Sequence, residues 1–125
     1  MLVCFGGMFY IIILYLSVVF GNVIGNVFFK IGSRAIPTIG TVPFTEVVGA
    51  ILNKWFFLGI FGFVLSFPAF MLLLTRQKIS IVYPIVTGLT FVIISLVSVF
   101  YLKESLSAAQ IVGIFVIFLG LTMLA

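Results

Sequence analysis

The chain has 125 residues, of which 65% are hydrophobic and only 6% are charged, with a formal net charge of +4. Soluble domains contain roughly 25% charged residues, so this composition excludes an ordinary water-soluble fold. The charged residues divide the chain into uncharged runs over 1–29, 55–75, 79–102 and 105–125. About 20 apolar residues cross the bilayer as a helix. We therefore expect an all-α integral membrane protein, a single domain over 1–125 with four transmembrane helices at about 5–29, 55–75, 79–102 and 107–125.

The first predicted helix carries a polar stripe. Asn22, Asn26 and Lys30 are spaced by four residues and so share one helical face. Gly21 and Gly25 beside them allow a second helix to pack closely. Polar side chains are costly inside a bilayer, which makes the stripe a candidate substrate pathway, although holding two subunits together explains it equally well. Lys30 is near the helix end and also fits a lysine that extends to the headgroups.

The connection after this helix contains a second, shorter helical pattern. Beyond Pro43, apolar residues recur at helical spacing on one face: Phe44, Val47, Val48, Ile51 and Leu52. This pattern predicts a short amphipathic helix over about 43–53. Two placements remain open: flat in the membrane interface, or across the mouth of the bundle beside a lipid-accessible opening.

Single residues mark the second and third predicted helices. Trp55 is placed to begin the second helix at interface depth. Pro68 predicts a kink, because proline removes a backbone donor. On the third helix, Tyr83, Thr87 and Thr90 share a face. Threonine in a membrane helix most often hydrogen-bonds to its own backbone, so a structural role for these hydroxyls is the simpler explanation.

The fourth predicted helix has a defined start and a glycine pattern. Ser107 followed by Gln110 predicts a capping box. This start leaves a tight turn at about 103–105, so the third and fourth helices should form an antiparallel hairpin. Gly113 and Gly120, seven residues apart, lie on one side and predict a packing seam.

The remaining charges bear on topology and partners. The loops at 30–54 and 103–104 carry four of the six cations, which weakly favours that side as cytoplasmic and leaves inverted insertion open. The cations are scattered, which argues against a nucleic-acid surface. The sequence has no histidine, and neither glutamate lies within a long apolar run. We therefore expect no metal site, no cofactor, no proton relay and no enzyme active site.

Several segments resemble a known family. The sequences FGNVIGNVFFK (20–30) and SIVYPIVTGLTFVIISLVSVFYLKESLSAAQIVGIFVIFLGLTM (80–123) resemble the first, third and fourth helices of small multidrug resistance transporters and of the wider drug/metabolite transporter superfamily. NKWFFLGIFGFVLSF (53–67) is similar to the second helix. The resemblance implies a multi-pass transporter of the bacterial inner membrane. Tyr83 then matches the family's pocket tyrosine, and Gly113 and Gly120 match the seam through which two subunits pair.

Two positions depart from the multidrug pattern. Asn22 stands where the family's exporters have a membrane-embedded glutamate, and Val86 stands where they have a pocket tryptophan. The carboxylate that attracts a cation and releases it on protonation is therefore missing. Proton-coupled export of cations does not follow from the resemblance alone.

A second branch of the superfamily is more similar. The subunits that flip aminoarabinose linked to undecaprenyl phosphate also lack the glutamate, and their first helix resembles Gly25, Asn26 and Lys30. Their third helix begins with a tyrosine–proline pair like Tyr83–Pro84, and the segment before their second helix resembles residues 53–55. This resemblance implies translocation of a lipid-linked or amphipathic solute, with membrane lipids as partners. The implied substrate pathway comprises Asn22, Asn26, Lys30, Tyr83 and Thr87, and the implied phosphate-pairing residues are Lys30 and Arg34.

Three hypotheses follow from the sequence. The first is a flippase-like transporter that works by alternating access as a homodimer. The second is a multidrug-type exporter of cationic compounds, with a heterodimer containing a glutamate-bearing partner as one form. The third is a membrane subunit that transports nothing.

Overall fold

The computed structural model describes residues 2–38 and 40–125, with the side chains of residues 5–38 and 40–125. The described chain forms the helices α1 (Leu2–Ser33), α2 (Phe44–Ile51), α3 (Lys54–Arg76), α4 (Ile79–Phe100) and α5 (Ala108–Leu124). By length and composition, α1, α3 and α4 are sufficient to cross a membrane, and α5 is a shorter apolar helix of 17 residues. The predicted all-α membrane protein is confirmed, including a short helix between the first two spans.

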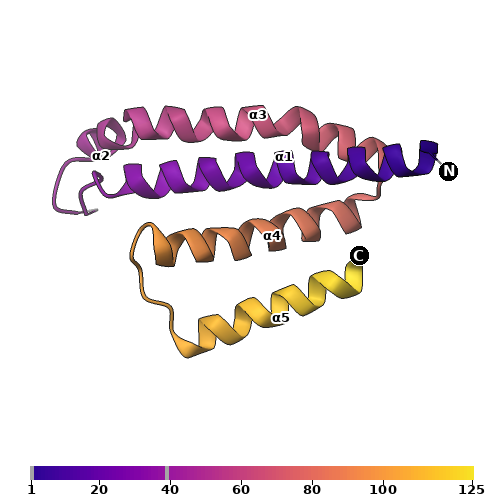
Figure 1. The fold of residues 1–125 in the computed structure, drawn as a ribbon. Coiled ribbons are helices and arrows are strands. Elements are labelled where there is room, and N and C mark those ends of the chain that lie inside the picture. The colour runs from indigo at the N-terminus through magenta and orange to yellow at the C-terminus, as the bar shows by residue number, and fades with distance from the viewer. Residues whose placement is uncertain (1, 39) are drawn as a thin grey trace.

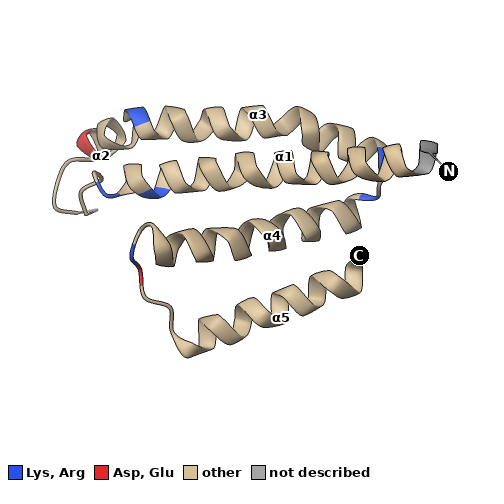
Figure 2. Ribbon diagram, in the orientation of Figure 1, with Lys and Arg blue, Asp and Glu red and all other residues tan. Residues whose placement is uncertain are grey.

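The long helices lie roughly side by side (Figure 1). α1 lies between α3 and α4, and α5 packs on the outer side of α4. The N- and C-termini share one end, and α2 is at the other. Acidic and basic residues are confined to the two ends of the helices, and the stretch between them is uncharged (Figure 2). The charge pattern that predicted the spans is therefore also the pattern that the structure shows.

α1 and α3 approach each other along a glycine seam, formed by Gly21 and Gly25 of α1 with Gly59 and Gly62 of α3. A Cβ at Gly62 would lie 3.0 Å from the backbone nitrogen of Gly25 and 3.1 Å from the carbonyl oxygen of Gly21. Backbones this close require glycine on both helices. The close packing expected beside Gly21 and Gly25 is confirmed.

The start of α3 is tied to the end of α1 by Asn53. Its Oδ1 accepts a hydrogen bond from the backbone N–H of Phe56 at 3.0 Å, so it caps the helix. Its Nδ2 donates to the carbonyl oxygen of Gly32 at 3.1 Å. Trp55 follows in the first turn, as expected, and Pro68 lies inside α3.

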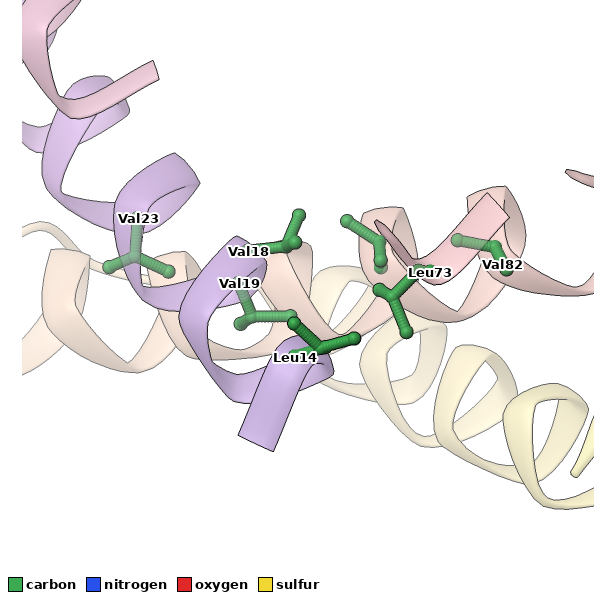
Figure 3. Close-up of a cluster of buried hydrophobic side chains, with 7 residues drawn as sticks. Leu14, Val18, Val19, Val23, Leu73 and Val82 are labelled. Atoms are coloured by element: carbon green, nitrogen blue, oxygen red, sulfur yellow. The ribbon is translucent and has the colours of Figure 1, made fainter. Parts of the chain in front are cut away.

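The apolar core lies where α1 meets α4 and the end of α3. Its buried side chains are Leu14, Val18, Val19, Val23, Leu73, Val82 and Val86, most of which are labelled in Figure 3. Leu73 and Val82 are fully buried. By contrast, α5 has no buried residue along its length. The chain thus has a tightly packed part, α1 with α3 and α4, and a peripheral helix.

The connection between α4 and α5 is wider than the tight turn that we expected. α4 ends at Phe100, and α5 begins at Ala108. The chain turns through Lys103, whose φ is +55°, and the N–H of Glu104 donates to the carbonyl oxygen of Ser98 at 3.0 Å. This bond folds the loop back over the last turn of α4 and takes up the extra residues.

The predicted features around this loop are otherwise confirmed. Ser107 and Gln110 form both hydrogen bonds of the capping box. α4 and α5 run antiparallel as a hairpin (Figure 1).

Residues on the apolar face of the amphipathic helix α2 differ in how far they are buried. Val47 is buried, whereas Phe44 on the same face is 81% exposed. α2 lies at the end of α1 and α3, where Ile51 borders a small cavity of about 180 Å³ together with Phe29 and Phe56. One part of the face therefore packs on the bundle, and the other points outward.

Candidate substrate cavity

A cavity of about 290 Å³ lies between α1, α3 and α4. Asn22 of α1 lines it, together with Tyr83 and Thr87 of α4. These three predicted pathway residues come from helices far apart in sequence. Ser66 of α3 adds a fourth polar group, and the other lining side chains are aliphatic or aromatic. No charged side chain among the described residues lines this cavity.

Asn22 is held by Ser66. The single proton of the Ser66 hydroxyl is shared between the carbonyl oxygen of Phe63 at 2.8 Å and Oδ1 of Asn22 at 3.2 Å. Ser66 is buried, because the glycine seam brings α3 against α1 at this depth. The Nδ2 group of Asn22 makes no hydrogen bond to another described residue. Its two N–H donors are therefore left for a ligand or for water.

Asn26 does not line this cavity. Its Nδ2 donates to the carbonyl oxygen of Asn22 at 2.8 Å, within the same helix. The predicted stripe therefore divides: Asn22 borders the cavity, and the Asn26 side chain bonds to the backbone one turn before it. Sequence spacing placed both residues on one face, but the spacing did not show where the amides would bond.

Lys30, also predicted on the pathway, is paired with an acid. Its Nζ lies 3.1 Å from Oε1 of Glu104 in the α4–α5 loop. The Ser98 hydroxyl donates to the other carboxylate oxygen. The hydrogen bond from Ser98 and then that from Lys30 lower the pKa of Glu104, and Arg34 adds a further favourable charge. Glu104 was missed as a partner because its position beside Lys30 depends on the fold of the loop.

The cavity reaches the outer surface of the bundle between α3 and α4. Tyr83 on α4 and Phe67 on α3 line it, and each is 61% exposed. The two helices make few contacts with each other, whereas both pack on α1. The cavity therefore opens on the outer surface of the bundle between α3 and α4.

The predicted dimer seam on α5 is unoccupied within the chain. A Cβ added at Gly113 or Gly120 would meet no atom within 4 Å. The contact between α4 and α5 uses a different glycine, since a Cβ at Gly88 would lie 2.7 Å from the side chain of Leu121. Gly113 and Gly120 are thus free to meet a neighbouring molecule.

The described residues contain no group of three His, Cys, Asp or Glu side chains suited to a metal ion. The polar groups of the cavity are an amide and three hydroxyls, which bind by hydrogen bonding. This set favours recognition and passage of a solute over covalent chemistry.

Comparison with known proteins places the chain in a family. A sequence model of the Small Multidrug Resistance protein family matches residues 39–117, from the connection before α2 into α5. α1, with Asn22 and Lys30, lies outside the matched range. Searches of curated proteins and of solved structures give no match. Because the matched range covers more than half of the sequence, the chain belongs to the Small Multidrug Resistance protein family and is a small multi-pass transporter of the cell membrane.

Proposed function

We propose that this protein moves a lipid-linked or amphipathic solute across the membrane by alternating access, as a homodimer. The observation that carries the proposal is the uncharged polar cavity at Asn22, which is open sideways to lipid. Its lining offers hydrogen bonds to a polar headgroup, and its opening leaves a path for an attached chain. The sequence resemblance to the subunits that flip aminoarabinose linked to undecaprenyl phosphate supports a lipid-linked solute, although it does not bear on the charge of the headgroup.

The charge of the cavity argues against a cationic solute. An ion inside the membrane is stabilised by an opposite charge or by water. In this cavity the position of the family's glutamate is taken by Asn22, an uncharged amide whose Oδ1 accepts from Ser66. A cation would find no counter-charge among the described lining residues, whereas an uncharged polar headgroup would need none.

The size of the cavity separates headgroup from tail. Sites for drug-sized ligands usually measure about 300–1,000 Å³, so 290 Å³ holds a headgroup and little more. An attached apolar chain therefore remains in the lipid, outside the exposed Tyr83 and Phe67. Such an arrangement moves the headgroup across the bilayer without taking the tail out of it.

A phosphate on the solute would meet Lys30 and Arg34 at the α2 end of α1. Lys30 is eight residues from Asn22, or about 12 Å along the helix. The Lys30 side chain is half exposed, so an incoming phosphate can exchange with Glu104 as its partner. Asn26, between the two, belongs to the same face of the proposed pathway.

The homodimer is proposed from α5. The face that carries Gly113 and Gly120 also exposes Val116 and Leu124, and a Cβ at either glycine would meet no atom of the chain. Small residues at a helix surface permit close packing with a second helix in the membrane. Two copies packed through α5 would leave the cavity of each accessible to lipid.

A headgroup-accessibility assay tests the function. Vesicles containing the purified protein would carry a fluorescent glycolipid with an uncharged sugar headgroup, and an impermeant quencher would report its movement between leaflets. We expect movement in protein vesicles and its loss in Asn22→Ala, with Ser95→Ala as the control, because the Ser95 hydroxyl bonds to its own helix and does not line the cavity. Equal movement in empty vesicles, or an unaffected Asn22→Ala protein, would refute the proposal.

The multidrug-type exporter remains the second candidate, since the matched family is described by multidrug resistance. It predicts proton flux driven by quaternary ammonium or guanidinium cations in the same vesicles. Our proposal predicts none, because no carboxylate lines the described cavity. Clear proton-coupled transport of these cations would favour the exporter.

A further inference from the structure

Thr90 buries an unpaired hydroxyl on α4. The residue is 8% exposed, and its Oγ1 has no hydrogen-bond partner among the residues that the structure describes. A polar group buried without a partner destabilises the fold, so such a group calls for an explanation.

Other hydroxyls on the membrane helices avoid this cost. Those of Ser17, Ser66, Thr75, Ser95 and Thr122 each donate to a carbonyl oxygen in the preceding turn of their own helix. The preceding turn of α4 offers Thr90 the same kind of acceptor, and the side chain does not use it. What distinguishes Thr90 from the exposed Thr87 one turn earlier is that its unpaired hydroxyl is buried.

Thr90 lies just beyond the cavity. Val86 and Thr87 line the cavity one turn before it, and Ile93 one turn after it lines an apolar groove of about 500 Å³ against α1. Thr90 shares the buried face of α4 with Val82 and Val86, which pack against the α1 core. From Thr87 to Thr90 the helix rises by about 4.5 Å.

α4 is the wall of the cavity best placed to shift. α1 and α3 are joined backbone to backbone at the glycine seam, so they are expected to move as one unit. α4 packs on α1 through aliphatic side chains such as Val86, and it makes few contacts with α3. Thr90 does not line the cavity in this structure, so its hydroxyl would reach a ligand there only if α4 shifted and the cavity lengthened by one turn.

We propose that Thr90 is a specificity-determining residue of the cavity, whose hydroxyl binds the headgroup of an uncharged, hydroxyl-bearing amphiphile. This inference rests on the proposed function and names the substrate class. The Nδ2 group of Asn22 requires an acceptor, and the Thr90 hydroxyl both donates and accepts. A sugar-like headgroup supplies both kinds of group. An ammonium headgroup accepts from neither residue, and an anionic one would lack a counter-charge in the described cavity.

Three hexyl amphiphiles with different headgroups test this substrate class. Wild-type protein in phosphatidylcholine nanodiscs would be titrated calorimetrically with hexyl glucoside, hexyl phosphate and hexyltrimethylammonium. We expect hexyl glucoside to bind most tightly. Thr90→Val keeps the shape of the side chain and removes the hydroxyl. It should weaken glucoside binding about three- to tenfold, the effect of one hydrogen bond, and leave the other two ligands unchanged.

Stability provides the second readout. Thr90→Val removes an unpaired buried hydroxyl, so the ligand-free variant should unfold at the same or a higher temperature than the wild type. The fluorescence of Trp55, which does not line the cavity, would report unfolding. The matched control is Thr122→Val, whose hydroxyl bonds to its own helix, and it should leave glucoside binding unchanged. Thr90→Ser keeps a hydroxyl and should retain most of the affinity.

The outcomes separate the two proposals. If the wild type binds hexyl glucoside and Thr90→Val binds it equally well, the inference about Thr90 is overturned and the proposed function stands. If Thr90→Ser binds as weakly as Thr90→Val, the hydroxyl is not the recognising group, which also overturns the inference. If the wild type binds only hexyltrimethylammonium, the proposed function itself fails.

Discussion

The glycine seam makes a quantitative prediction for Gly21→Ala. The added Cβ would lie 2.6 Å from Cβ of Ser66 and 2.9 Å from the carbonyl oxygen of Gly62. Neither atom is the end of a flexible side chain, so relief requires movement of α3 itself. The change would also displace Ser66 from Asn22, which links the packing of the seam to the cavity.

The magnitude follows from two opposing effects. Overpacking by a methyl group costs about 1–3 kcal/mol, and the rigid neighbours place this site in the upper half of that range. Replacing glycine by alanine inside a helix recovers up to about 1 kcal/mol. We therefore expect Gly21→Ala to lower the free energy of unfolding by about 1–2 kcal/mol.

Gly7→Ala is the matched control on the same helix. A Cβ at Gly7 meets no atom within 4 Å, so only the gain in helix propensity applies. Both variants would be unfolded in mixed micelles by rising dodecyl sulfate, followed by far-ultraviolet circular dichroism and Trp55 fluorescence. A Gly21→Ala protein as stable as Gly7→Ala would refute the contact at the seam.

Further predictions concern the cavity, the ion pair and the dimer. Asn22→Asp places a carboxyl in the cavity, so cation binding should appear where the wild type shows none. A proton-flux assay in vesicles would detect it, and the same flux in the wild type would contradict the reasoning. Glu104 has a lowered folded-state pKa, so its contribution to stability is complete above its usual value of 4.5 and is lost as pH falls through the folded value. Glu104→Gln should remove this part of the acid sensitivity in unfolding experiments, with Glu46→Gln as the control. Gly113→Leu projects into open space within the chain, so we expect normal folding and weaker self-association by cross-linking; unchanged association would count against the proposed seam.

Much of the fold could be predicted from the sequence because the bilayer imposes simple requirements. Charged residues avoid the hydrocarbon layer, so their positions marked the ends of α1, α3 and α4. The start of α5 depended on a local pair, Ser107 and Gln110, whose bonding is determined within one turn. Both kinds of signal are complete in a short stretch of chain.

The contacts of the cavity needed the tertiary structure. In the sequence, Ser66 is a single serine within an apolar run. It contacts Asn22 because α1 and α3 pack closely at Gly59 and Gly62. The pairing of Lys30 with Glu104 likewise joins residues from opposite ends of the chain. Two helices that share no sequence pattern can meet at any rotation, so these partners could not be inferred from spacing.

The uncharged middle of the helices also has an electrical consequence. A charge that moves across the membrane exchanges about 2.3 kcal/mol for each 100 mV of potential. The acidic and basic side chains lie at the two ends of the bundle, so a shift of α4 carries no side-chain charge through the field. The resting balance between the two access states should therefore not depend on membrane voltage, and any voltage dependence of transport would report the charge of the cargo.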